Sequence, residues 1–169
     1  MKRQSKVFLL IFSFLMIAAF YVLFTRPDKE KIAERLKEKY SETVTPGSGN
    51  YDSLVKIDLQ GKQAILFREV IRAQMYSNPF SVFTHKFNLD ETRRILKIVT
   101  DSTNFRWGEI GTPFFDNTIV LLDKNENRIG YIDVSFDGQI NMFPNLAVTK
   151  WGLLADKGFK ELVTATRTR

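Results

Sequence analysis

The longest apolar stretch of the chain lies close to its start. Val7–Phe24 (VFLLIFSFLMIAAFYVLF) contains no charged residue, and only Ser13 and the hydroxyl of Tyr21 are polar. A helix satisfies its own backbone hydrogen bonds in hydrocarbon, and a run of about 18 apolar residues is at the lower limit for spanning a core of ~30 Å. The pattern therefore predicts a transmembrane helix over residues 7–24.

Two other interpretations of this stretch are weaker. Lys2, Arg3 and Lys6 resemble the basic start of a secretory signal peptide, but the apolar run exceeds the usual length of about 7–15 residues and ends without a small-residue cleavage site. A buried core helix is disfavoured because the remaining chain offers little cover for a helix that is apolar on all sides. We interpret residues 1–6 as a cytoplasmic basic tail and residues 7–24 as an uncleaved signal anchor.

The pattern becomes highly charged after the anchor. Pro27 can open a helix, and the sequence that follows, DKEKIAERLKEKY, favours helix formation. Its apolar residues Ile32, Leu36 and Tyr40 form one narrow stripe, which is typical of a solvated helix or of a helix that contacts a partner. We predict a juxtamembrane stalk helix over residues 25–42.

A short stretch rich in glycine and serine separates the stalk from the rest. Pro46, Gly47, Ser48 and Gly49 sustain neither a helix nor a strand. We therefore predict a flexible linker over residues 43–51.

Residues 52–169 have the pattern of one α+β domain. Alternation predicts a strand at Leu54–Leu59, and helical spacing predicts a helix over Gly61–Tyr76, with a strand over Ala64–Ile71 as the alternative. Phe80–Phe87 has the composition of a strand, and acidic residues open a predicted helix at Asp90–Asp101.

The second half of this domain predicts an antiparallel meander. Its strands are expected at Asn117–Asp123, Arg128–Phe136 and Gln139–Phe143, with turns at Lys124–Asn127 and Asp137-Gly138. Val148–Thr166 predicts either one helix broken near Gly158 or two short helices. Because helices and hairpins are segregated along the chain, we expect an α+β fold with the meander packed against two to four helices.

Charge and composition exclude several classes of function. The chain carries 25 Lys and Arg against 19 Asp and Glu, and the excess of six positive charges is spread over the tail, the stalk and the domain. No basic cluster with interleaved aromatic residues is present, so we expect no nucleic-acid partner. The absence of cysteine excludes disulfides, zinc–thiolate sites and cysteine nucleophiles.

The basic residues that flank the anchor give conflicting signals about orientation. Three precede the anchor, and six follow it: Arg26, Lys29, Lys31, Arg35, Lys37 and Lys39. That count favours a cytoplasmic domain, but the residues after the anchor alternate with acids, and long domains translocate largely regardless of charge. We expect a cytoplasmic N-terminus and an extracytoplasmic domain, periplasmic or extracellular, with a domain on the cytoplasmic side as the alternative.

The segment 105–115 is the most unusual polar stretch. It combines Trp107, Glu109, two glycines and a proline with Phe114 and Phe115, and loops of this composition can carry function. We take Trp107, Glu109, Phe114 and Phe115 as tentative binding residues. The alternative is a structural loop in which the tryptophan packs and the glutamate caps or forms a salt bridge.

The chain offers no convincing catalytic or metal-binding motif. Phosphate-loop, dinucleotide-loop and zinc-protease motifs are absent, His85 is the only histidine, and Asp123–Arg128 resembles a calcium loop only at its start, so we interpret it as a hairpin turn. We therefore expect no enzyme activity, no cofactor and no metal. A hydrolase-like enzyme that uses Glu109 with Asp116 or Asp133 is the alternative.

These patterns identify no family. They predict a single-pass membrane-anchored protein of the cell envelope, whose α+β domain acts as a binding or structural module at the membrane surface. The expected partners are the lipid bilayer, through Val7–Phe24, and a protein that contacts either the stalk stripe or the 105–115 loop.

Overall fold

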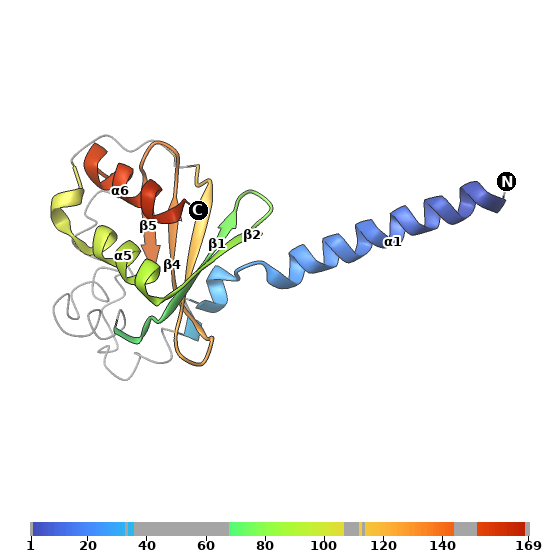
Figure 1. Ribbon diagram of the computed structural model, residues 1–169, viewed down its shortest axis with the longest axis horizontal. Helices are drawn as coiled ribbons and strands as arrows, with labels where there is room; N and C mark the ends of the chain where they lie inside the picture. The colour runs from blue at the N-terminus through green and yellow to red at the C-terminus, as the bar shows by residue number, and fades with distance from the viewer. Residues whose placement is uncertain are drawn as a thin grey trace, which may run out of the picture.

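The fold is α+β, as predicted, with one long helix projecting from a sheet that carries further helices on one face (Figure 1). The computed structural model describes residues 2–32, 34–35, 68–106, 112, 114–143 and 152–167. The predicted linker at 43–51 and the predicted strand at Leu54–Leu59 lie outside these residues, as do Trp107 and Glu109.

Helix α1, Lys2–Thr25, contains the apolar run. Its large apolar side chains from Val7 to Tyr21 have exposed fractions between 53% and 73%. In the described part of the chain, no helix combines the length and the apolarity needed to cross a membrane. The predicted helix is confirmed, whereas the predicted transmembrane span is not.

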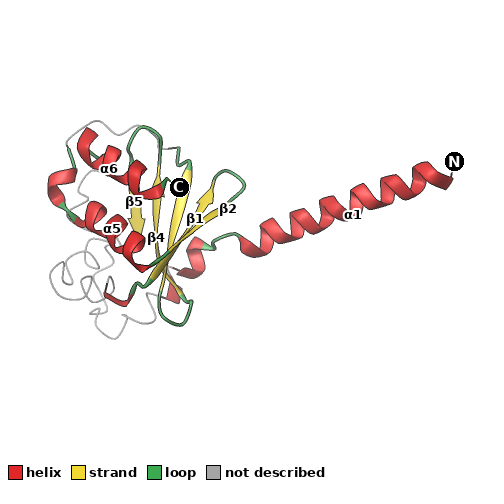
Figure 2. Cartoon of the chain, viewed as in Figure 1, coloured by secondary structure: helices red, strands yellow, loops and turns green. Residues whose placement is uncertain are grey.

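The sheet has five antiparallel strands in the order β2-β1-β3-β4-β5 (Figure 2). Strands β1 and β2 form one hairpin, and β3, β4 and β5 form a meander. The two units join where β1 pairs with β3. The predicted meander is confirmed, and so is the strand predicted within Phe80–Phe87. The bounds are β1 Arg72–Ser77, β2 Val82–Phe87, β3 Asn117–Leu122, β4 Arg128–Val134 and β5 Ile140–Phe143.

The helix predicted over Gly61–Tyr76 is wrong at its C-terminal end, because Arg72–Ser77 form strand β1. Ala73 and Tyr76 point to opposite faces of the sheet, and both are almost fully buried. Because β1 lies between two strands and is covered on both faces, its buried residues reproduce a helical i, i+3 spacing. The apolar residues that predicted the helix lie mostly before this strand, at Ala64, Phe67, Val70 and Ile71, and only Met75 of that set belongs to β1.

Helices α5 (Leu89–Thr100) and α6 (Asp156–Thr166) pack together on one face of the sheet. Asn88 and Glu91 form a reciprocal capping box at the start of α5, which satisfies two backbone N–H groups. The side of α5 predicted to be buried faces the core. Core residues here include Ile95, Val99, Ile119, Leu121, Ile132 and Leu162.

Helix α6 runs through Gly158 without a break, so the predicted interruption is wrong. A Cβ atom at Gly158 would lie 2.8 Å from the Cβ atom of Asn104 and 2.9 Å from its carbonyl oxygen. Asn104 belongs to the short 3-10 helix η1, Ser102–Asn104. The glycine therefore permits close packing of α6 on η1.

Candidate functional site: a cleft beside the end of α1

The segment that follows α1 lies against the second face of the sheet. Pro27 is buried, Ile32 is only 2% exposed and belongs to the core, and Arg128 of β4 donates a hydrogen bond of 3.1 Å to the carbonyl oxygen of Arg26. One residue of the predicted stalk stripe is thus used inside the molecule. The other two, Leu36 and Tyr40, lie outside the described residues.

Lys29 fixes this segment to the sheet through Asp133. The lysine Nζ lies 2.6 Å from Asp133 Oδ1, which also accepts a 2.7 Å hydrogen bond from the hydroxyl of Thr118. The lysine Nζ also lies 5.1 Å from the centre of the Tyr131 ring. The Asp133 side chain is 3% exposed and that of Lys29 is 38% exposed. A buried carboxylate is costly without partners, so these contacts make the charge tolerable in the sheet.

The sheet register explains why a threonine and a carboxylate meet at this point. Thr118 of β3 is the direct partner of Asp133 of β4, so their side chains lie on the same face. Tyr131 lies two residues before Asp133 and therefore points to the same side. This face is opposite to the one that packs against α5 and α6.

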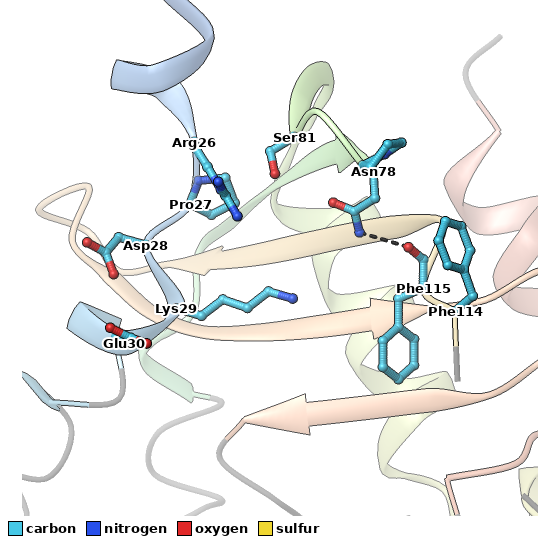
Figure 3. A pocket seen from close by; sticks show the side chains of 10 residues that line it. Arg26, Pro27, Asp28, Lys29, Glu30, Asn78, Ser81, Phe114 and Phe115 are labelled. Atoms are coloured by element: carbon cyan, nitrogen blue, oxygen red, sulfur yellow. Dashed lines mark hydrogen bonds between the residues drawn. The ribbon is translucent and has the colours of Figure 1, made fainter. Parts of the chain in front are cut away.

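A cleft of about 640 Å³ opens between the segment that follows α1 and the loops at one end of the sheet. In Figure 3 the Lys29 side chain points across this space, whereas the carboxylates of Asp28 and Glu30 lie on the other side of the segment. The lining combines two basic and two acidic residues with two phenylalanines, and the Lys29 ammonium that crosses the space is paired with Asp133. Its residues are Arg26, Pro27, Asp28, Lys29, Glu30, Asn78, Pro79, Ser81, Phe114 and Phe115.

Asn78 holds the far wall of the cleft together. Its side-chain amide donates hydrogen bonds of 3.0 Å to the carbonyl oxygen of Phe115 and 3.2 Å to the Thr118 hydroxyl. Its backbone N–H donates to the carbonyl oxygen of Asp116 at 2.8 Å. One asparagine thus connects the β1–β2 turn to the loop before β3.

Asp28 stabilises the short helical turn that borders the cleft. Its carboxylate accepts a 3.1 Å hydrogen bond from the backbone N–H of Lys31 and forms an ion pair with the ammonium of the same residue. The backbone N–H of Lys31, followed by its ammonium group, lowers the pKa of Asp28. This acid is therefore used locally, as expected at the start of a helix.

Two of the four tentative binding residues line this cleft. Phe114 is 69% exposed, and Phe115 is half-buried beside it. Arg26, Lys29 and Asn78 were not predicted as site residues. No local pattern connects Lys29 with Asp133, which lies 104 positions away.

The carboxylates considered for hydrolase chemistry serve structural roles. Asp133 is held by Lys29 and Thr118, and Asp116 Oδ2 accepts a 2.6 Å hydrogen bond from the backbone N–H of Phe136. The hydrolase alternative stays untested because Glu109 lies outside the described residues.

The remaining polar candidates are also accounted for by local structure. Asp123 Oδ1 accepts hydrogen bonds from the backbone N–H groups of Asn125 and Asn127, which shows the predicted hairpin turn. His85 is half-buried on β2, with its ring centre 4.6 Å from that of Phe87. Among the described residues, no group of three or more His, Asp or Glu side chains is placed to hold a metal ion.

The comparisons with known proteins gave no match to a protein-family model, to a curated protein or to a solved structure. The function must therefore be argued from the geometry of the cleft and its position in the molecule.

Proposed function

We propose that this protein is a non-enzymatic binding module attached to a membrane. In this proposal Val7–Phe24 inserts as a single-pass anchor, the basic N-terminus stays in the cytoplasm, and the α+β domain works on the extracytoplasmic side, in the cell envelope. The cleft beside the end of α1 is the binding site.

The exposed side chains of α1 support the attachment. Every large apolar side chain from Val7 to Tyr21 is more than half exposed in the isolated chain. An apolar surface of this extent is unstable in water and marks a site of contact with lipid or protein. A bilayer covers all sides of such a helix at once, whereas a single protein partner covers one side.

We propose that the cleft binds an extended segment of a partner protein that carries an apolar or aromatic side chain. The observation that carries this proposal is the exposed ring of Phe114 at the rim of a cleft with a polar wall. Aromatic side chains next to concave surfaces commonly dominate binding energy, and surrounding polar groups fix the orientation of the ligand. Asn78 and Ser81 supply polar groups on this wall.

Site-specific photo-crosslinking in native membranes tests this proposal. Phe114 would be replaced by a photoreactive phenylalanine analogue in the full-length chain, with the same analogue at Thr164 of α6 as the control. Thr164 is exposed, and α6 lies on the opposite face of the sheet.

We expect a discrete protein adduct at residue 114 and none at residue 164. A second variant that combines the analogue with Asn78→Ala should lose most of the adduct, because Asn78 connects the walls of the cleft. Equal labelling at both positions, or labelling at neither, would contradict the proposed binding site.

A further inference from the structure

The tip of the β1–β2 hairpin is apolar and exposed. The eight residues from Ser77 to Thr84 (SNPFSVFT) contain no charge. Within them Phe80 is 72% exposed, Val82 44% and Phe83 37%. Turns usually carry polar residues, so three exposed apolar side chains at a hairpin tip mark a contact surface.

This surface is distinct from the cleft. Pro79 and Ser81 line the cleft, whereas Phe80, Val82 and Phe83 do not. The Phe83 ring packs edge-on against Tyr76, with ring centres 5.8 Å apart. The hairpin therefore presents one side to the cleft and a different, apolar side to its surroundings.

The apolar tip lies beside the end of α1. Helix α1 contacts β2, and Arg26, the first residue after α1, borders the same cleft as Ser81. In Figure 1 the hairpin tip is on the side of the domain from which α1 projects. The turn between β3 and β4, by contrast, carries the charged residues Asp123, Lys124 and Glu126.

We propose that the hairpin tip inserts its apolar side chains into the lipid–water interface next to α1. The occupant of this surface is the bilayer, because a membrane that accepts α1 would meet the tip without any further partner. Aromatic side chains favour the headgroup region, and Arg26 can reach lipid phosphates from the end of α1. This inference rests on the proposed membrane attachment.

A second contact with the membrane gives the domain a fixed tilt. A domain held only by α1 can rotate about the end of that helix. A domain held by both α1 and the hairpin tip has a fixed orientation relative to the membrane surface. The cleft lies between these two elements, so its opening would stay at the level of the lipid headgroups. A partner segment would therefore be bound at the membrane surface rather than at a distance from it.

The absence of cysteine makes the test direct. Single-cysteine variants of the full-length chain, Phe80→Cys, Lys124→Cys and Phe12→Cys, would each carry a nitroxide spin label. After reconstitution into vesicles of phosphatidylcholine with one quarter phosphatidylglycerol, collision rates with oxygen and with a water-soluble nickel chelate report the depth of each label. Circular dichroism checks that the labelled variants keep the wild-type spectrum.

We expect the ratio of oxygen to nickel collisions at residue 80 to exceed that at residue 124 at least several-fold. A label at residue 80 that behaves like residue 124 would overturn the inference, and so would a label shielded from both reagents, which indicates a protein contact. Residue 12 separates the two proposals. If it is in lipid while residue 80 is in water, only the hairpin contact fails, whereas water exposure at residue 12 contradicts the attachment itself. If Phe80→Cys does not fold, Val82→Cys on the same apolar side, where the side chain is 44% exposed, gives the same readout.

Discussion

Lys29 has a specific role among the charged residues after α1, because it compensates a buried carboxylate. Replacing Lys29 with methionine keeps the length of the side chain and leaves Asp133 without its cation. An unsatisfied buried polar group costs about 1–3 kcal/mol of folding free energy. Because the lysine side chain is partly exposed, we expect Lys29→Met to lower the free energy of unfolding by about 1 kcal/mol. Urea unfolding of the full-length protein in detergent micelles, followed by tryptophan fluorescence, measures this loss.

The same change in an Asp133→Asn background provides the control. Without the carboxylate there is no charge to compensate, so Lys29→Met should cost clearly less than in the wild-type chain. Lys31→Met is a further comparison, because Lys31 pairs with the exposed Asp28 and should have little effect. Equal losses for Lys29→Met in both backgrounds would mean that the ion pair does not stabilise the segment.

Asp137 in the turn between β4 and β5 makes stability depend on pH. Its carboxylate accepts hydrogen bonds from the Ser135 hydroxyl and from the backbone and side-chain N–H groups of Gln139, and these donors, the hydroxyl first, lower its pKa below 3.8. A depressed pKa in the folded state stabilises the protein above the unfolded pKa, and this contribution disappears as pH falls through the folded value.

Asp137→Asn should therefore lower the free energy of unfolding at pH 6, and the difference from wild type should shrink below about pH 3.8. Urea unfolding of both proteins at pH 6, 4 and 2.5 measures this difference. A constant difference over that range would show that the ionised carboxylate is not what stabilises the turn.

At the scale of elements, the contact between α6 and η1 depends on one glycine. Alanine at an exposed helical position would add up to about 1 kcal/mol of stability over glycine. At Gly158 the new Cβ atom would meet the backbone of Asn104 at 2.9 Å, and overpacking typically costs about 1–3 kcal/mol. Gly158→Ala should therefore lower stability, whereas Lys157→Ala, an exposed change in the same turn, should not. A Gly158→Ala variant as stable as Lys157→Ala would rule out close packing at this point.

Elements with local signals could be predicted from the sequence. Helix α5 begins with its own capping residues, and turn residues mark the ends of β3, β4 and β5. The predicted bounds of these elements therefore lie within a few residues of the observed ones. Strand β1 and the continuity of α6 were missed because both depend on neighbours. Strand β1 is defined by its pairing with β2 and β3, and the reason for Gly158 lies in Asn104, 54 residues earlier.

In the candidate site, too, local signals could be predicted and long-range contacts could not. Phe114 and Phe115 stood out as adjacent aromatic residues at the end of an unusual loop sequence, and the structure places both at the cleft. The partners of Lys29 and Asn78 are 104 and 37 or more residues away, so only the folded sheet brings them together. A charged segment after an anchor suggests a solvated stalk, and nothing local reveals that Ile32 is part of the core.

At the scale of the whole molecule, the end of α1, the cleft and the hairpin tip lie together. In the proposed attachment, the side of the membrane that they face decides which partners they can reach. The basic tail before α1 and the long domain after it favour an extracytoplasmic domain, although six basic residues follow the helix. Alkaline phosphatase fused to the C-terminus should therefore be active in a bacterial host, because this enzyme folds only outside the cytoplasm. Fluorescence from a matched fusion to a protein that folds only in the cytoplasm should be absent.

The three basic residues of the tail provide the control for this topology. Replacing Lys2, Arg3 and Lys6 with glutamine removes the charges that hold the N-terminus inside in the proposed topology, so part of the population should invert and phosphatase activity should fall severalfold. The cytoplasmic reporter should gain signal in the same variant, which separates inversion from poor expression. A silent phosphatase fusion with an active cytoplasmic reporter on the wild-type chain would place the cleft inside the cell, where the basic residues after α1 would obey the positive-inside rule.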